Sequence, residues 1–352
     1  MTHFKNAHFL IIRLSSIGDV LHCTTVAHNL KRHFPDCKLT WLASPPASLL
    51  LEGNSDIDEL LIWDRRPFDK LALSHHFIDA KHELDKLKPI FSNRHFDIVL
   101  DTQCLLLTGI IAKMSHAPRR IGIRDRHEFN HLFMTDVAPD IHDRHKIRRY
   151  LSSLLPLGIN APYDYSLQLN LPSWAEGYTS SFWESHGIDT SKKILIVNTR
   201  TSWPDKNWPS ERFGYAIDML PEDIQIVFSG APGDQQYIDK AQNVMHRSSI
   251  SIAGEPNLMQ LAALFSKADC VLTGDTGPLY IACAVKTPTI SIWGPTHPDI
   301  YGPLTGDNRF VLTTCECHSC CKTHCKKKTN ECINAITVAS VQHELRSFFQ
   351  LN

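Results

Sequence analysis

The chain has 352 residues, and at about 150 residues per domain this length predicts two domains. Its 43% hydrophobic and 21% charged residues exclude a disordered or fibrous protein, and the near balance of 36 Lys and Arg against 37 Asp and Glu excludes a general attraction to nucleic acid. The N-terminus has no signal-peptide pattern, and no apolar run reaches the roughly 18 residues of a membrane-spanning helix. We therefore expect a folded cytoplasmic protein, at most peripheral to a membrane.

Short apolar runs alternate with helical segments in the first half of the chain. Residues 8–14, 38–43 and 96–101 predict buried strands, and residues 17–34 and 104–115 predict helices. This βαβ order predicts a doubly wound parallel sheet, in which ligands gather at the carboxyl ends of the strands.

Residues 160–191 carry several prolines and glycines with little periodicity, and we place a domain boundary near residue 170. The alternation of strands and helices then starts again. The expected strands are 193–199, 224–229, 269–273 and 289–293, and the expected helices are 209–220, 233–245, 258–267, 278–285 and 336–349. The sequence therefore predicts two Rossmann-like α/β domains, 1–170 and 171–352.

The first strand runs into Ser15-Ser16-Ile17-Gly18-Asp19. A serine followed three residues later by an acid is typical of a capping box, which is one interpretation. The other is functional, because a carboxylate at a helix N-terminus and at the carboxyl end of a strand can act as a general base in a cleft between domains. The helix dipole lowers the pKa of such a carboxylate, so it would be a weak base unless the acceptor excludes water.

A second polar loop, 199–209, lies between a predicted strand and a predicted helix. The hydroxyl groups of Thr201 and Ser202 and the ammonium of Lys206 suit a phosphate chain. A solvent-exposed lysine on an ordinary loop is the alternative interpretation.

A third loop has the sequence Thr-Gly-Asp-Thr-Gly-Pro at 273–278, where a strand ends and a helix begins. The backbone N–H groups of Thr276 and Gly277 can meet an anion there, while Asp275 can accept hydrogen bonds from hydroxyl groups. An ordinary turn between strand and helix is the alternative.

Arginines concentrate in the basic stretch 113–126. Arg119, Arg120 and Arg124 are the candidates for binding phosphates or carboxylates of an anionic acceptor, with a solvated charged loop as the alternative.

Six of the eleven cysteines lie between 315 and 332, and four of them follow the pattern C-x2-C-x4-C-x6-C. Four thiolates at this spacing are typical of structural zinc or an iron–sulfur centre. Reduced thiols or an occasional disulfide are the alternatives, and we assign no metal. The four are Cys317, Cys320, Cys325 and Cys332.

Three other enzyme classes are disfavoured. Residues 127–131 match the zinc-protease pattern H-E-x-x-H, but they lie between predicted strands at 120–123 and 133–137, which leaves no room for the required helix. The sequence contains neither G-x-G-x-x-G nor G-x-x-x-x-G-K-[ST], which argues against a nicotinamide dehydrogenase and a P-loop NTPase.

Several of these motifs together resemble glycosyltransferase family 9, the ADP-heptose:lipopolysaccharide heptosyltransferases. They are S-S-I-G-D-V-L-H at 15–22, K-N-W-P at 206–209, D-T-G-P at 275–278 and G-P-T at 294–296, and their order and spacing fit along essentially the whole chain. The resemblance implies a GT-B fold of two Rossmann-like domains facing each other across a cleft. Domain 1–170 would bind the acceptor and domain 171–352 the donor.

The resemblance also implies an inverting transfer that needs no metal and no cofactor. Asp19 would deprotonate the acceptor hydroxyl, and Lys206 would offset the charge on the departing diphosphate. The donor-binding residues would be Gly18, Thr201, Ser202, Asp234, Asp275, Thr276, Gly277 and Tyr280, and the acceptor-binding residues Arg119, Arg120 and Arg124.

Two of these positions depart from the family pattern. Asp234 stands where the family tends to place a glutamate against the ribose of the nucleotide. Tyr280 stands where the family usually has a histidine. Because tyrosine cannot become cationic near neutral pH, its contribution to phosphate binding differs from that of histidine.

We therefore expect a cytoplasmic enzyme, peripheral at the inner membrane, that transfers heptose from ADP-heptose to an inner-core sugar of lipopolysaccharide. A related family 9 transferase with another nucleotide sugar or glycan acceptor is the alternative within the class, and nucleotide preference would distinguish it. A non-catalytic metal-binding or scaffold protein built on the cysteine cluster is the alternative of another class. In that case Asp19→Ala would be harmless, whereas joint loss of Cys317 and Cys320 would abolish function.

Overall fold

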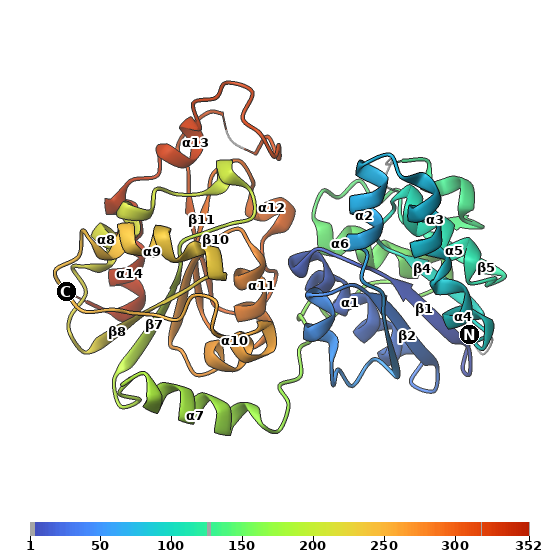
Figure 1. Cartoon of the computed structure of the whole chain (residues 1–352), viewed down its shortest axis with the longest axis horizontal. Coiled ribbons are helices and arrows are strands. Elements are labelled where there is room, and N and C mark those ends of the chain that lie inside the picture. Colours follow the sequence, from blue (N-terminus) through green and yellow to red (C-terminus); the bar gives the residue numbers. More distant parts are fainter. Residues whose placement is uncertain (1–3, 125–127, 318, 352) are drawn as a thin grey trace. The chain divides into compact units, whose positions relative to one another are not determined.

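The computed structural model describes residues 4–124, 128–317 and 319–351. The chain divides after Asn170 into two compact units, and each is an α/β unit with one six-stranded sheet covered by helices (Figure 1). Every described strand pair in both sheets is parallel. The prediction of doubly wound parallel sheets is confirmed. None of the described helices is both long and apolar enough to cross a lipid bilayer.

The sheet of the N-terminal unit has the order β3-β2-β1-β4-β5-β6. Its strands are β1 (His8–Ile12), β2 (Lys38–Ala43), β3 (Glu59–Ile62), β4 (Ile98–Asp101), β5 (Arg119–Gly122) and β6 (Asp136–Val137). Its helices are α1 (Ile17–His33), α2 (Arg66–Leu73), α3 (Phe77–Asp85), α4 (Leu87–Ser92), α5 (Leu106–Met114) and α6 (Lys146–Leu151). The chain leaves β1 toward β2 on one side and later returns to β4 on the other, so the strand order reverses beside the carboxyl end of β1. Open α/β sheets bind ligands at such a switch point.

The sheet of the C-terminal unit has the order β12-β11-β10-β7-β8-β9 and reverses between β7 and β10. Its strands are β7 (Lys193–Asn198), β8 (Ile224–Ser229), β9 (Ile250–Ser251), β10 (Cys270–Gly274), β11 (Thr289–Trp293) and β12 (Asn308–Leu312). Its helices are α7 (Ala175–Ser185), α8 (Ser210–Ile217), α9 (Gln235–Gln242), α10 (Leu258–Phe265), α11 (Gly277–Ala284), α12 (Pro298–Tyr301), α13 (Glu331–Asn334) and α14 (Val338–Phe349). Because β7 and β10 are neighbours, the two polar loops that follow them lie side by side.

Buried apolar side chains on the central strands hold the helices onto each sheet. Leu10 and Ile12 of β1 pack into a cluster with Leu87 and Phe91 of α4. In the other unit, residues of β7 pack into a cluster with Phe213 of α8 and with the buried face of α14. Full burial of such a side chain stabilises the fold by about 1.5–3 kcal/mol, so these strands are the rigid parts from which the loops emerge.

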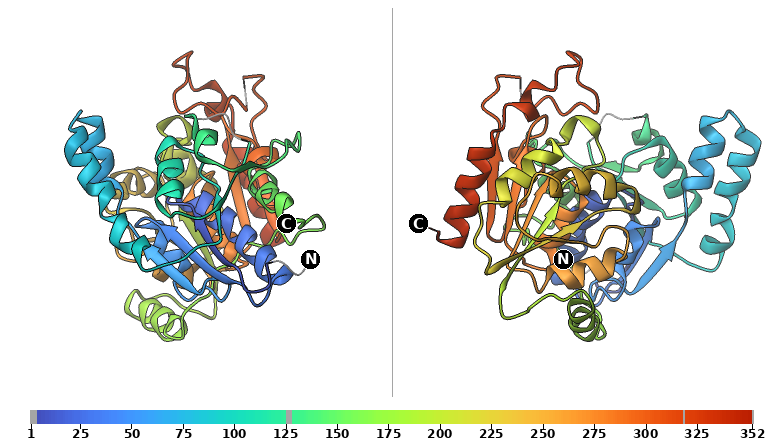
Figure 2. Two further views of the ribbon diagram at one scale, coloured as in Figure 1. Left: turned by 90° about the vertical axis from the view of Figure 1, so that its right-hand side faces the viewer. Right: turned by 60° about the vertical axis from the view of Figure 1, so that its left-hand side comes forward.

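Several elements were not expected, among them the edge strands β3, β9 and β12 and three longer helices. The pair α2 and α3 lies side by side at the outer edge of the N-terminal unit (Figure 2), in a stretch for which we predicted no element. Helix α7 falls in the stretch 160–191, where we found little periodicity. Its buried residues Ala175, Thr179 and Trp183 form only one narrow stripe, so the helical signal in the sequence is weak.

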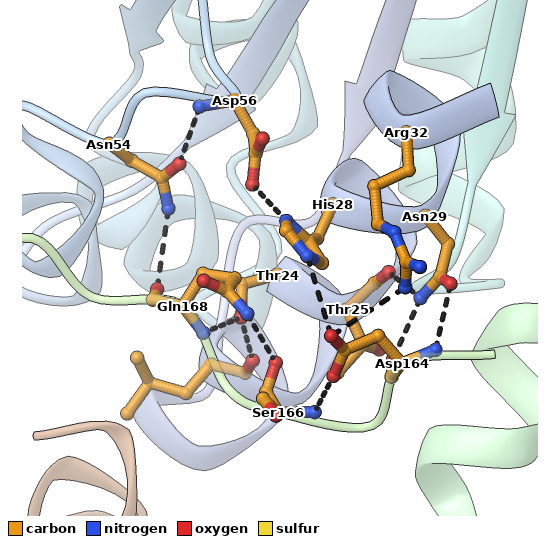
Figure 3. A network of polar contacts seen from close by, with 11 residues as sticks. Thr24, Thr25, His28, Asn29, Arg32, Asn54, Asp56, Asp164, Ser166 and Gln168 are labelled. Carbon is orange, nitrogen blue, oxygen red and sulfur yellow. Dashed lines mark hydrogen bonds and ion pairs between the residues drawn. The ribbon is translucent and has the colours of Figure 1, made fainter. Parts of the chain in front are cut away.

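The segment that leaves the N-terminal unit is fastened to α1 by side-chain hydrogen bonds (Figure 3). The Asn29 amide donates to the Asp164 carbonyl (2.7 Å) and accepts from its N–H (2.9 Å). The N–H of Gln168 donates to the Thr24 hydroxyl (2.9 Å), and His28 lies 3.6 Å from the Asp164 carboxylate. Residues 164–168 therefore belong to the N-terminal unit, which explains why the division of the chain falls just after them.

Candidate active site

The carboxylate of Asp19 is held by three side chains at the carboxyl end of β1. Its Oδ2 pairs with Nη2 of Arg13 (2.8 Å) and accepts from Oγ of Ser16 (2.9 Å), and its Oδ1 accepts from the hydroxyl of Tyr150 (2.6 Å). Ser16 is the N-cap of α1, but its side chain does not bond to the helix backbone. The capping-box interpretation is therefore wrong for Ser16, and the Asp19 side chain remains 27% exposed.

Charge and burial act in opposite directions on this carboxylate. Burial raises the pKa of Asp19, but the Arg13 guanidinium and the hydrogen bond from Tyr150 outweigh it and hold the pKa well below its ordinary value. Burial and the Asp19 charge together hold the pKa of Tyr150 well above its ordinary value, so Tyr150 stays a hydrogen-bond donor. The site thus presents a fixed, ionised carboxylate.

Sequence reasoning missed Arg13 and gave no role to Tyr150. The Arg13 side chain is only 8% exposed, donates to the carbonyl of Thr102 (2.8 Å) and lies 4.9 Å from the centroid of the Tyr150 ring. A single arginine at the carboxyl end of an otherwise apolar strand was the available signal. A buried cation needs a buried or half-buried anion beside it, and Asp19 is the first acid that follows.

A second carboxylate, that of Asp275, closes the loop after β10. Its Oδ2 pairs with Nζ of Lys206 (2.6 Å) and accepts from the hydroxyl of Thr296 (2.7 Å), and its Oδ1 accepts from the hydroxyl of Tyr280 (2.6 Å). The side chains of Lys206 and Asp275 are 11% and 5% exposed. Lys206 is therefore not a solvent-exposed loop lysine, and both oxygens of Asp275 already have partners.

The loop after β7 packs closely onto the end of β10. The N–H of Thr201 donates to the side chain of Asn207 (2.7 Å), and the hydroxyl of Thr201 donates to the carbonyl of Trp203 (2.9 Å). A Cβ at Gly274 would lie 2.8 Å from a methyl carbon of Thr201, so only glycine permits this approach. The ammonium of Lys206 lies 4.0 Å from the centroid of the Trp203 ring.

The remaining donor candidates are placed around these two loops or beside Asp19. Thr276 is the N-cap of α11, and Gly277 is its first residue. Ser202 is exposed, whereas Gly18 is buried in the first turn of α1. Asp234 follows β8 and accepts from the N–H of Ala231 (2.8 Å). Of these candidates, Lys206 contacts Asp275 directly. Thr201 lies against Gly274, the residue before Asp275.

The three predicted acceptor arginines have different surroundings. Arg119 pairs with Asp136 (3.2 Å), and Arg120 donates to two backbone carbonyls (2.6 and 2.7 Å). Arg124 lines a cavity of about 640 Å³ beyond the carboxyl end of β5, together with several apolar side chains. The donors of Arg119 and Arg120 thus serve the fold, and Arg124 is the one of the three that lines this cavity.

The zinc-protease interpretation of residues 127–131 has no support in the described part of this segment. His127 and the neighbouring Arg126 lie outside the described residues. Asn130–Phe133 forms a short 3-10 turn, which cannot present two histidines on one face of an α-helix.

The four patterned cysteines lie around one small cavity of about 20 Å³, which Asp205 also lines. All eleven cysteines are free thiols, and among residues 4–124, 128–317 and 319–351 no three His, Cys, Asp or Glu side chains are placed to hold one metal ion. Burial raises the pKa of Cys332 to about 11. The cysteines are far from Lys206 in the sequence. In the structure, however, Asp205, the residue before Lys206, lines the same cavity as the four cysteines.

Two parallel α/β units of this kind define the GT-B class of glycosyltransferase folds. The crystal structure of the glycosyl transferase family 9 protein from Veillonella parvula matches this chain with a TM-score of 0.85 at 23% identity, covering 100% of this chain and 99% of that one. Escherichia coli heptosyltransferase WaaC with ADP matches with a TM-score of 0.74 at 19% identity, covering 97% and 99%.

The family model for glycosyltransferase family 9 (heptosyltransferase) matches residues 85–330, and the chain belongs to this family. The lipopolysaccharide core heptosyltransferase OpsX of Haemophilus influenzae is 26% identical over 294 residues, which cover 82% of this chain and 79% of the relative. The chain is thus a glycosyltransferase, and the scaffold interpretation loses its basis.

Proposed function

We propose that the protein transfers heptose from ADP-heptose to an inner-core sugar of lipopolysaccharide, with inversion at the anomeric carbon and without a metal ion. The observation that carries the proposal is the ionised, partly exposed Asp19 carboxylate, fixed by Arg13 and Tyr150 at the switch point of its sheet. The family relatives support the heptose and the lipopolysaccharide acceptor, and a related E. coli structure holds ADP-2-deoxy-2-fluoro heptose.

In the proposed reaction, Asp19 accepts the proton of the acceptor hydroxyl while that oxygen bonds to the anomeric carbon. The bond from the anomeric carbon to the ADP oxygen breaks in the same displacement, and ADP leaves with the electron pair. Because the pKa of Asp19 is low, the proton moves late, as the new C–O bond forms and the hydroxyl becomes acidic. Arg13 keeps the carboxylate ionised until that moment.

The charge that develops on the leaving ADP is offset by Lys206, in the role that a divalent cation has in other transferases. The hydroxyl groups of Thr201 and Ser202 and the N–H groups of Thr276 and Gly277 complete the proposed diphosphate site. Asp275 holds Lys206, and it binds a sugar hydroxyl only by exchanging one of its present partners.

Three further assignments complete the donor and acceptor sites. Asp234 binds the ribose of the nucleotide, and Gly18 gives the donor sugar space beside Asp19. Arg124 binds an anionic group of the acceptor, since it lines a cavity at the carboxyl edge of its sheet. Because lipopolysaccharide is anchored by its lipid, we place the enzyme in the cytoplasm, peripheral to the inner membrane.

The test is mass spectrometry of a heptose-deficient lipopolysaccharide acceptor after incubation with ADP-heptose and the purified protein. The wild type adds one heptosyl unit, whereas Asp19→Ala adds none and still binds ADP. Transfer by Asp19→Ala at the wild-type rate would contradict the assignment of the base. Failure of both proteins to transfer, with ADP still bound, would contradict the sugar or the acceptor.

Transfer of another sugar is a second candidate, which the environment of Tyr280 favours. Tyr280 is 4% exposed and donates to Asp275, where the family usually places a histidine that can carry a positive charge. A donor that differs from that of the family is therefore the second candidate, because the side chain at this position differs from that of the family. Competition among ADP, GDP and UDP in calorimetry tests the nucleotide, and a preference of at least about tenfold for ADP, roughly 1.4 kcal/mol, would exclude a donor with another nucleotide. Transfer assays with other ADP-sugars test the sugar itself.

A further inference from the structure

Asp205, the residue before Lys206, bonds through its carboxylate to the cysteine-rich segment. Its Oδ2 accepts from the backbone N–H of Cys325, and its Oδ1 accepts from the side chain of Asn330 (3.0 Å). Figures 1 and 2 show the cysteine-rich segment, residues 313–317 and 319–336, in orange and red as loops and the short helix α13 that extend from the C-terminal unit. The carboxylate of Asp205 thus joins this segment to the proposed diphosphate loop.

The same segment also holds the chain on the other side of Lys206. The indole N–H of Trp208 donates to the carbonyl of Ile336 (3.0 Å), and Arg212 donates to the same carbonyl (2.9 Å). Asp205 and Trp208, which flank Lys206 and Asn207, are therefore both hydrogen-bonded to the same stretch of chain, residues 325–336. Because the chain is fixed on both sides of these two residues, the backbone of the lysine between them has little freedom.

The segment also packs against the loop that supplies Thr296, the second partner of Oδ2 of Asp275. The N–H of Cys321 donates to the carbonyl of Pro295 (2.9 Å). A Cβ at Gly294 would lie 3.0 Å from the side chain of Ile333, so α13 packs directly onto this backbone. Thr296, two residues further, donates to Asp275. The cysteine-rich segment therefore braces both loops from which Asp275 receives its Oδ2 partners.

We infer that Asp205 is a positioning residue of the transferase, which acts through Lys206 by anchoring its loop to the cysteine-rich segment. This inference rests on the proposed function for Lys206, and it assigns the segment a role in donor binding in place of a separate activity. Electrostatic stabilisation needs a charge that is already in place when the leaving group departs. The two bonds of Asp205 keep the backbone of Lys206 in place, so that its ammonium, paired with Asp275, starts from one position when the donor arrives.

Asp205→Asn is the variant that separates this role from general folding. An asparagine at this position has one acceptor oxygen, and its NH₂ group would face either the Cys325 N–H or the Asn330 NH₂, which are both donors. Both bonds lose their charged acceptor while the size of the side chain stays the same, and the bond to Asn330 survives only if the Asn330 amide turns its unpartnered Oδ1 toward the new NH₂ group. Asn330→Ala also removes one bond from the other side. Asp189→Asn is the matched control, because the Asp189 carboxylate accepts from Ser191 before the amino end of β7, whereas Lys206 follows the carboxyl end of that strand.

Hydrogen–deuterium exchange of the free protein is the first measurement, since it needs no substrate. The amides of residues 203–208 exchange about tenfold faster in Asp205→Asn than in the wild type or in Asp189→Asn. Unchanged exchange in this peptide would overturn the anchoring role, and it would do so whether or not the protein transfers heptose.

A double-mutant cycle with Lys206 is the second measurement, with kcat and KM for the nucleotide sugar as readouts. Asp205→Asn lowers kcat about tenfold with a smaller change in KM, Asp205→Glu recovers part of the loss, and in the Lys206→Ala background Asp205→Asn has less than about a twofold effect. Equal effects in both backgrounds would show that Asp205 does not act through Lys206. If the wild type transfers no sugar, the cycle is run on ADP affinity, and additive losses there overturn the inference in the same way.

Discussion

The two units carry polar centres of similar composition, one around Asp19 and one around Asp275. In both, a carboxylate near the carboxyl end of a central parallel strand receives one cation, one tyrosine hydroxyl and one aliphatic hydroxyl. The partners of Asp19 are Arg13, Tyr150 and Ser16, and those of Asp275 are Lys206, Tyr280 and Thr296. Similar partners do not give the two carboxylates the same role.

Exposure and the type of cation separate the two centres. The Asp19 side chain is 27% exposed and its cation is a buried arginine, whereas the Asp275 side chain is 5% exposed and its cation is a lysine. Arginine keeps its charge and its fork geometry, so Arg13 is a permanent support for Asp19. Lysine is a flexible point charge that can turn toward a phosphate. The partly exposed Asp19 carboxylate can therefore accept a proton from a bound acceptor. The buried Asp275 carboxylate instead pairs with a lysine that can turn toward a phosphate.

The largest expected effect is that of Asp19→Asn. Removal of a general base costs about 10³-fold in rate, so kcat for heptosyl transfer falls by that factor while ADP affinity stays the same. Initial rates and calorimetry measure the two quantities. Asp275→Asn is the comparison, and it lowers ADP affinity, because it removes the ion pair that holds Lys206 where the two loops of the proposed diphosphate site meet. A loss of ADP affinity in Asp19→Asn equal to that in Asp275→Asn would erase the difference between the centres.

Lys206→Ala is expected to have the next largest effect. Loss of a charge-assisted hydrogen bond to a phosphate lowers ADP affinity by about 10- to 30-fold, since such bonds contribute about 1.5–2 kcal/mol. Lys267→Ala, which removes a half-exposed lysine of the same unit, is the control and leaves the affinity unchanged. Calorimetry with ADP measures both variants. Equal affinities in Lys206→Ala and the wild type would remove the lysine from the proposed diphosphate site.

Much of the fold and of the loop positions could be predicted from the sequence. Apolar runs of five or six residues separated by helical periods give the central strands, and parallel pairing then places the loops after β7 and β10 beside each other. Lys206 and Asp275 are 69 residues apart, yet their strands are neighbours, so the pattern predicts their proximity.

The partners of these residues could not be predicted in the same way. Arg13 and Tyr150 meet at Asp19 because α6 packs beside α1. The local sequence pattern does not determine how two helices pack against each other. Arg119 and Arg120 looked free for a ligand, but their donors are taken by residues far along the chain or by carbonyls that only the fold brings near. The contact of Asp205 with Asn330 spans 125 residues and joins two irregular loops, for which no periodicity exists.

Tyr280→Phe tests how much the stability of the fold depends on the hydrogen bond to the buried Asp275 carboxylate. The variant leaves Oδ1 of a buried carboxylate without its donor, so the free energy of unfolding falls by about 1–2 kcal/mol. Chemical denaturation measures this loss. Tyr150→Phe is the matched variant in the other unit, and its loss is smaller, because water can reach the more exposed Asp19 carboxylate. A larger loss in Tyr150→Phe would show that Asp19 is the more enclosed of the two.

Tyr150→Phe has the smallest expected effect on rate, and it is seen in the pH dependence. In the wild type the pKa of Asp19 lies well below its ordinary value, so the base stays ionised and kcat/KM does not fall with decreasing pH until below about pH 4.

The Tyr150 hydroxyl stabilises the charged form of Asp19, and its removal in Tyr150→Phe raises the pKa of Asp19, which moves the acid limb of the pH profile to higher pH. At neutral pH the rate changes by less than about fivefold, because a stronger base offsets the looser orientation. The same depressed pKa means that Asp19 stabilises the fold above the ordinary carboxyl pKa of about 3.9 and that this contribution disappears as the pH falls through the folded-state value. An acid limb that does not move in Tyr150→Phe would show that Arg13 alone keeps Asp19 ionised, and the tyrosines of the two centres would then differ in function as their carboxylates do.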